Sequence, residues 1–207
     1  NVLVCHRRFG KTVCMINHLI RSALLSKLKN PRFAYIAPTF KQAKSIAWDY
    51  MKQFTAKIPH TKFNETELRV DLPNGSRITL LGSESPDGLR GIYLDGCVID
   101  EYANVNSKLF PEIIRPALSD RKGYCVFIGT PMGMNNNFYE LYQHAQGAED
   151  WFNYKAKASQ TKIVDEDELQ KAKEVMGEKK YLQEFECDWI ANIEGAVYGD
   201  IISKMGD

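Results

Sequence analysis

Three consecutive residues near the start of the chain could together bind a phosphate group: Gly10, Lys11 and Thr12. They follow an apolar run, Val2–Cys5, that predicts a short buried strand, and they precede a helical pattern. A turn between a strand and a helix directs backbone N–H groups and the helix N-terminus at an anion. In this context we predict that Lys11 reaches the β- and γ-phosphates of a nucleotide and that the Thr12 hydroxyl holds Mg²⁺.

The segment Cys5–Thr12 resembles the phosphate-binding P-loop, G-x-x-x-x-G-K-[ST], with one departure, because Cys5 stands where the first glycine is expected. The loop also carries two arginines, which a protein that senses the γ-phosphate would use. We therefore expect the whole loop to bind ATP through Cys5, His6, Arg7, Arg8, Phe9, Gly10, Lys11 and Thr12. The alternative is a chance Gly-Lys-Thr at a helix start, and residues downstream decide between the two.

Two adjacent carboxylates, Asp100 and Glu101, end the apolar run Gly96–Ile99. Ligands of open parallel sheets bind at the carboxyl ends of the strands. We predict that Asp100 holds the Mg²⁺ of the nucleotide and that Glu101 orients and deprotonates the attacking water. The alternative is an acidic strand end that faces solvent, but the position of the pair after a P-loop in an alternating pattern favours the catalytic interpretation.

Thr130 follows a third apolar run, Tyr124–Ile128, and lies between Gly129 and Pro131. If that run is a neighbouring strand, its end places Thr130 near Glu101 and the γ-phosphate, as a sensor of hydrolysis. The alternative is ordinary turn chemistry, since glycine and proline often end strands.

Arg90 lies in a loop between Gly88 and Gly91, just before the acidic strand. A guanidinium that projects from a mobile loop could act as an arginine finger on a neighbouring subunit. The alternative is a solvated loop arginine, which is common.

Strand and helix patterns alternate along the chain, which predicts an α/β fold with a mostly parallel sheet and helices on both faces. Strands are expected at Val2–Cys5, Phe33–Ala37, Glu67–Leu72, Arg77–Leu81, Gly96–Ile99, Tyr124–Ile128 and Tyr154–Ala158. Helices are expected at Val13–Lys27, Lys41–Ala56, Leu109–Leu118, Phe138–Ala145, Asp165–Val175 and Lys179–Glu186. The residues Pro73-Asn74-Gly75 predict a hairpin. We divide the chain into an ATPase core at residues 1–160 and a small helical lid subdomain with a linker at residues 161–207.

The composition limits the classes of function. The chain has 207 residues, which suffice for one sizeable domain with a small appendage. Its formal net charge is +1, so contacts with nucleic acid must come from local basic patches. No apolar run is long enough to span a membrane, and a membrane partner is not expected. The first residue is Asn1 rather than Met, so we expect native sequence upstream.

The order of these motifs resembles the ATPase domain of the large terminase subunit of tailed bacteriophages. The motifs that carry the resemblance are His6–Thr12, Pro38-Thr39, Gly88–Gly91, Val98–Glu101 and Gly129–Pro131. In addition, Tyr181–Phe185 and Gly195–Tyr198 resemble that family's segment between the ATPase and nuclease domains. The resemblance implies a P-loop NTPase fold of the RecA-like type.

The resemblance also implies a motor that uses ATP and Mg²⁺ to pump double-stranded DNA into a procapsid. The implied partners are further copies of the chain in a ring of five, the portal protein and the small terminase subunit. The implied location is the host cytoplasm, on the procapsid and not in the mature virion. Arg7 is implied to contact phosphate, with Arg90 as a candidate trans finger. The family's adenine-contacting segment and nuclease domain would lie outside this sequence, so we expect no DNA cleavage by it.

Two other functions remain open. A superfamily-2-type helicase or translocase would need a second RecA-like domain, for which 207 residues leave no room. A nucleotide-gated DNA-binding scaffold without turnover is compatible with Cys5 in place of a glycine.

Overall fold

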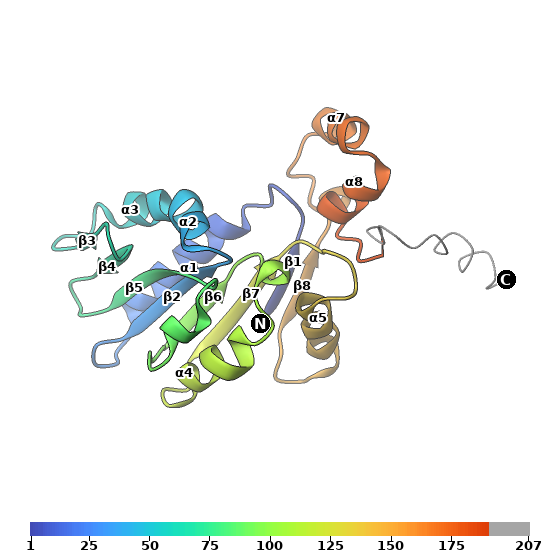
Figure 1. Ribbon diagram of the computed structural model, residues 1–207. Helices are drawn as coiled ribbons and strands as arrows, with labels where there is room; N and C mark the ends of the chain where they lie inside the picture. Colours follow the sequence, from blue (N-terminus) through green and yellow to red (C-terminus); the bar gives the residue numbers. More distant parts are fainter. Residues whose placement is uncertain (191–207) are drawn as a thin grey trace.

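The computed structural model describes residues 1–190, whose strands form one eight-stranded sheet in the order β3-β4-β5-β2-β6-β7-β1-β8 (Figure 1). The strands are β1 (Val2–Cys5), β2 (Arg32–Ala37), β3 (Lys62–Asn64), β4 (Arg69–Asp71), β5 (Arg77–Gly82), β6 (Gly96–Ile99), β7 (Tyr124–Gly129) and β8 (Asn153–Ala156). All pairs from β5 to β8 are parallel, and the pairs β3–β4 and β4–β5 are antiparallel. The predicted mostly parallel sheet is confirmed.

Helices cover both faces of this sheet. The α-helices are α1 (Lys11–Leu25), α2 (Phe40–Ala43), α3 (Asp49–Thr55), α4 (Arg115–Ser119), α5 (Asn137–Gly147), α6 (Ala158–Thr161), α7 (Glu166–Met176) and α8 (Glu178–Phe185). Shorter turns are the π-helical η1 (Lys44–Trp48) and η4 (Phe110–Ile114) and the 3₁₀ turns η2 (Pro86–Leu89) and η3 (Tyr102–Asn104). None of these helices, within the described residues, is long and apolar enough to cross a membrane.

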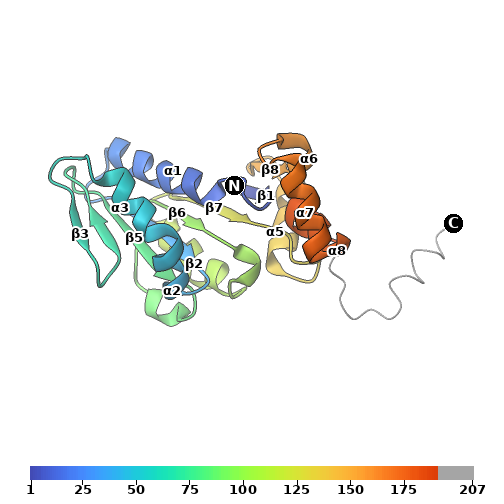
Figure 2. The same cartoon turned by 90° about the horizontal axis from the view of Figure 1, so that it is seen from above.

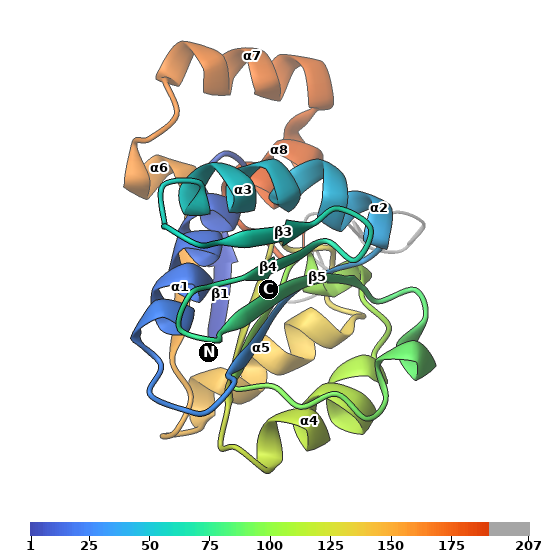
Figure 3. The same ribbon diagram turned by 90° about the vertical axis from the view of Figure 1, so that its left-hand side faces the viewer.

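Two apolar cores lie on opposite faces of the sheet, because successive residues of a strand point to opposite sides. On β2, Tyr35 packs under α1 and α3, whereas its neighbours Ala34 and Ile36 pack against η4, α4 and α5. Figure 3 shows α2 and α3 on one side of the sheet and α4 and α5 on the other.

The structure differs from the sequence expectation at one edge of the sheet. The strand expected at Glu67–Leu72 is shorter, Arg69–Asp71, and it pairs with β3, which was not expected. Two of the three β3 residues are exposed, so that strand has no apolar pattern to mark it. The hairpin is confirmed, since Gly75 adopts φ +85° between the antiparallel strands β4 and β5.

The sheet order brings three strand ends together. Because β7 lies between β1 and β6, the carboxyl end of β7 stands between the P-loop and the acidic pair. Helices α7 and α8 lie at the same end of the sheet, above β1 and β8 and far from the β3 edge (Figures 1 and 2).

Candidate nucleotide-binding site

The loop after β1 has the backbone of a phosphate-binding turn. Gly10 is the N-cap of α1 and adopts φ +87°, a left-handed conformation that favours glycine. No side chain among residues 1–190 caps this helix, so its first N–H groups remain for an external acceptor. The N-terminus of the 15-residue helix therefore points a partial positive charge at the pocket described below.

Cys5 stands where the P-loop pattern has its first glycine. It lies in extended backbone, a conformation that needs no glycine. It is the last residue of β1, pairs with Ala156 of β8, and is 1% exposed. Burial raises the pKa of its thiol to about 11, so the thiol stays protonated at neutral pH. The departure from the glycine pattern thus leaves the turn at Gly10 intact.

Asp100 is fixed by three donors at the end of β6. The Thr12 hydroxyl donates to Asp100 Oδ2 over 3.1 Å, and the Tyr35 hydroxyl donates to the same oxygen. The Glu101 N–H donates to Oδ1 over 2.8 Å. Sequence reasoning missed Tyr35, which reads there as an ordinary core residue of a buried strand. Burial is the main cause that raises its pKa, so it remains a donor at all ordinary pH values.

The pair Thr12 and Asp100 fits a magnesium ion that is bound jointly with phosphates. Hydroxyl and carboxylate oxygens are the hard ligands that Mg²⁺ takes, and it is bound by few protein groups together with phosphate and water. No cluster of three or more His, Cys, Asp or Glu residues that could hold a metal occurs in residues 1–190. The donor set therefore suits a nucleotide-bound Mg²⁺ rather than an ion caged by protein alone.

Glu101 faces Lys11 across the same pocket. Lys11 Nζ lies 3.6 Å from Glu101 Oε1, and the lysine side chain is 12% exposed. Glu101 adopts φ +47°, a strained conformation for a non-glycine residue that is typical of functional sites. Burial raises the pKa of its carboxyl, and the charge of Lys11 partly opposes this. The side chain is therefore held as a stronger base than an exposed glutamate.

The predicted residues Arg7, Lys11, Glu101 and Thr130 line one pocket of about 410 Å³. Helix α8 closes its other side with Lys180, Gln183 and Glu184, which sequence reasoning missed as pocket residues. The signal available for them was the resemblance at Tyr181–Phe185.

Two hydrogen bonds attach α8 to the pocket. The Arg7 N–H donates to the Glu184 carbonyl over 2.8 Å. The Gln183 amide, 1% exposed, donates to the Pro131 carbonyl over 2.7 Å. Helix α8 is thereby bonded to the P-loop and to the segment that follows Thr130.

Other loop side chains point away from the pocket. The buried His6 ring is 2.8 Å from the Thr161 hydroxyl and packs edge-on against Phe9. Arg8 pairs with Glu168 of α7 over 3.3 Å at the surface. The side chains of Cys5, His6 and Arg8 are thus engaged elsewhere, and the predicted binding role of these positions rests on their backbone.

Arg90 does not line the P-loop pocket. Its guanidinium lies 3.8 Å from Glu112 of η4, beside a separate pocket of about 440 Å³ that includes Tyr93 and Asp120. Its action on a neighbouring subunit stays a prediction. The segment Gly195–Tyr198 lies outside the described residues.

Comparisons with known proteins agree with one another. A family model described as "Terminase large subunit, T4likevirus-type, N-terminal" matches residues 4–203. The terminase large subunits of Thermus phage G20c and Thermus virus P23-45 are each 30% identical to this chain, over 52% of it and 26% of the relative. The chain thus spans about a quarter of the length of these relatives.

Solved structures establish the fold. The large terminase ATPase domain of Thermus phage P74-26 matches with a TM-score of 0.75 at 21% identity, over 91% of this chain and 88% of that one. The large terminase of another thermophilic bacteriophage, solved in complex with ADP, matches with a TM-score of 0.76 at 16% identity, over 91% of this chain and 48% of that one.

Proposed function

The chain belongs to the T4likevirus-type terminase large subunit family, whose N-terminal region it matches, and from this premise we propose that it is an ATP-hydrolysing motor domain. Its work is to move double-stranded DNA into a procapsid. The observation that carries the proposal is the contact between Thr12 and Asp100 beside the pair of Lys11 and Glu101, at one end of the sheet.

The six residues predicted from the sequence at and beside the pocket have these roles in hydrolysis. Lys11 and the N-terminus of α1 bind the phosphates, and Arg7 adds a further positive charge at the rim. Thr12 and Asp100 hold Mg²⁺, which neutralises charge on the transferred phosphoryl group when it is bound. Glu101 accepts the proton of the attacking water, and Thr130 senses the γ-phosphate from the end of β7.

The nucleotide of this proposal is ATP. A structural relative, the large terminase of a thermophilic bacteriophage, has been solved with ADP and with ATP-γ-S. The pocket of about 410 Å³ has the size of a nucleotide site, and its rim supplies the cations that a triphosphate needs.

Residues 161–207 act in this proposal as a lid subdomain and linker, on an ATPase core of residues 1–160. The partners are double-stranded DNA, further copies in a ring of five, the portal protein and the small terminase subunit. The protein works in the host cytoplasm on the procapsid and is absent from the mature virion.

Phosphate release tests the proposal directly. We expect Mg²⁺-dependent release of phosphate from ATP by the protein, with a rate per subunit that rises with protein concentration and changes when duplex DNA is added. Tight ATP binding without any turnover across these conditions would favour a nucleotide-gated scaffold and would overturn the motor.

A further inference from the structure

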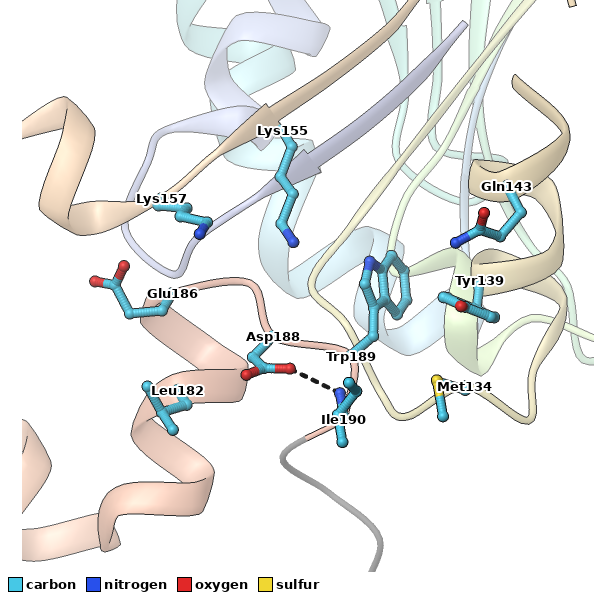
Figure 4. A pocket seen from close by; sticks show the side chains of 10 residues that line it. All are labelled: Met134, Tyr139, Gln143, Lys155, Lys157, Leu182, Glu186, Asp188, Trp189 and Ile190. Carbon is cyan, nitrogen blue, oxygen red and sulfur yellow. Dashed lines mark hydrogen bonds between the residues drawn. The ribbon is translucent and has the colours of Figure 1, made fainter. Parts of the chain in front are cut away.

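Helix α8 turns one side toward the P-loop pocket. Lys180, Gln183 and Glu184 are spaced at i, i+3 and i+4, so they lie on one face of the helix, and all three line that pocket. Leu182 and Glu186 line a second pocket of about 470 Å³, which Figure 4 shows from close by. The rotation of α8 about its own axis thus places Gln183 on the side of the P-loop pocket.

The side chain of Gln183 is buried, and both ends of its amide are bonded. The residue is 1% exposed, so it is not placed to contact a nucleotide itself. Its Nε2 donates to the Pro131 carbonyl over 2.7 Å, and its Oε1 accepts from Lys180 Nζ over 3.4 Å. The opposite orientation would set the amide oxygen against a carbonyl oxygen and the amide nitrogen against an ammonium group, so only this one satisfies both neighbours. The bond therefore links the position of α8 to that of Pro131.

The acceptor of this bond lies in a segment outside the sheet. Strand β7 ends at Gly129, and residues 130–133 have no regular secondary structure. The carbonyls of this segment accept from side-chain amides. Asn136, at the start of α5, donates to the two carbonyls that follow Pro131, over 3.1 and 2.7 Å. Gln183 donates to Pro131 itself, and it is the donor that comes from a distant part of the chain.

Thr130 precedes Pro131 and depends on the same bond. The threonine lines the P-loop pocket and is 7% exposed. Two rigid features connect it to the Pro131 carbonyl: the planar peptide bond between the two residues, and the proline ring, which locks φ. A fixed Pro131 carbonyl therefore restricts the direction in which Thr130 faces.

The next residue of α8 is bonded to the other side of the pocket. The Glu184 carbonyl accepts from the Arg7 N–H over 2.8 Å. Because Gln183 and Glu184 are consecutive residues of one helix, the bonds to Pro131 and to Arg7 start from points with a fixed spacing. Helix α8 thus sets the separation between the P-loop and the segment that begins at Thr130.

We propose that Gln183 is a positioning residue for ATP hydrolysis, which holds Thr130 toward the γ-phosphate through the Pro131 carbonyl. This inference rests on the proposed function, in which Thr130 senses that phosphate. A displacement of about 1 Å at a reacting group can cost about a hundredfold in rate. Loss of the Gln183 amide should therefore slow hydrolysis and leave nucleotide binding intact, because Lys11 and the N-terminus of α1 still hold the phosphates.

Two substitutions remove the amide donor in different ways. Gln183→Glu keeps the length of the side chain and can still accept from Lys180, but its carboxylate repels the Pro131 carbonyl. Gln183→Met removes the amide without adding a charge, and it serves as the second variant if the carboxylate disturbs the fold. The same two changes at Gln170, an exposed residue of α7, are the matched controls.

Single-turnover phosphate release and the affinity for Mg·ADP are measured on each variant. We expect both Gln183 variants to hydrolyse ATP about ten- to a hundredfold more slowly, with unchanged ADP affinity, and both Gln170 variants to match the unchanged protein. A fall in ADP affinity as large as the fall in rate, or a normal rate in both Gln183 variants, would overturn the proposal.

A double-mutant cycle tests the route through Thr130. Thr130→Val keeps the shape of the side chain and removes the hydroxyl. If Gln183 acts through Thr130, adding Gln183→Glu to Thr130→Val should slow hydrolysis no further, whereas independent effects multiply. Multiplied effects, or a normal rate in Thr130→Val, would overturn this proposal while the proposed function stands. No hydrolysis by the unchanged protein would overturn the proposed function itself, and with it the sensor role on which this proposal rests.

Discussion

The P-loop pocket and the Arg90 loop both carry charges suited to phosphate chemistry, but the two regions hold them differently. Beside the pocket, Asp100 is 3% exposed and is bonded to three donors, and Lys11, whose side chain is 12% exposed, faces Glu101, whose side chain is 34% exposed. Arg90 pairs with Glu112 at a site where both side chains are about half exposed. An exposed pair of this kind contributes about 0–1 kcal/mol to stability. We propose that the pocket binds a nucleotide within one subunit and that Arg90, which does not line it, acts on a neighbouring subunit.

The largest effect should come from removing the cation of the pocket. Lys11→Ala should abolish ATP binding and hydrolysis, because the phosphates lose the ammonium group that faces them. Titration calorimetry with ATP and Mg²⁺ measures the loss. Lys27→Ala, an exposed lysine beyond the end of α1, is the matched control and should bind normally. Normal ATP binding by Lys11→Ala, with an unchanged circular dichroism spectrum, would place the nucleotide elsewhere.

Glu101→Gln should separate binding from chemistry. The variant keeps the shape of the side chain and loses the base, so ATP should bind while hydrolysis falls by about a hundred- to ten-thousand-fold. Single-turnover phosphate release measures this step apart from product dissociation. If hydrolysis is normal in this variant, Glu101 is not the base.

The pH dependence of hydrolysis should follow Glu101. Burial raises the pKa of its carboxyl, and a base works only when deprotonated, so activity should be present above this raised pKa and be lost as the pH falls through it. The acid limb should therefore lie above the ordinary glutamate value. A rate profile of the assembled motor that stays flat down to the pKa of an exposed carboxylate would argue against this role.

Tyr35→Phe should have a smaller effect, which is confined to the binding of Mg²⁺. It removes one donor from Asp100 Oδ2 and leaves the ring in the core, so the Mg²⁺ needed for half-maximal ADP binding should rise about 10- to 100-fold. Tyr124→Phe is the matched control, because that hydroxyl donates to Ser22 and not to the site. Equal Mg²⁺ dependence of ADP binding in the two variants would show that the Tyr35 hydroxyl does not contribute to metal binding and that the side chain only packs in the core.

The smallest contrast lies within the loop, between its two arginines. Arg7 lines the pocket, whereas Arg8 pairs with Glu168 at the surface. Arg7→Ala should weaken ATP binding by about tenfold, as for the loss of one charged hydrogen bond. Arg8→Ala should leave the affinity unchanged and alter the free energy of unfolding by less than about 1 kcal/mol. If Arg8→Ala lost more ATP affinity than Arg7→Ala, the loop would have to change conformation on nucleotide binding and bring Arg8 to the phosphates.

Much of the fold and the centre of the site could be predicted from the sequence. Apolar runs marked β1, β6 and β7, and because parallel strands end at one edge of the sheet, Thr12, Asp100 and Thr130 were expected at that edge. The strand order β6-β7-β1 is what makes them neighbours. The acidic pair and the Gly-Lys-Thr turn are local patterns with a fixed place relative to their strands. These are features that periodicity and spacing encode.

The parts that could not be predicted depend on tertiary placement. Nothing local marks Tyr35 as a donor to Asp100, because its position reads as core until β2 and β6 are paired. The same holds for Gln183, which reaches Pro131 across 52 residues of sequence. The strand β3 was missed because its side chains are mostly exposed and carry no pattern.

The proposed difference between the P-loop pocket and the Arg90 loop is tested most directly by mixing two inactive variants. Arg90→Ala subunits keep an intact P-loop, and Lys11→Ala subunits keep an intact Arg90, so in a mixed ring one can complete the site of the other. Where it has been measured, an arginine supplied in trans is worth roughly 10³- to 10⁵-fold in rate. Under assembling conditions we expect the mixture to recover ATP hydrolysis that neither variant shows alone. No recovery, in rings shown to contain both variants, would contradict the account and leave Arg7, already at the pocket, as the arginine of the reaction.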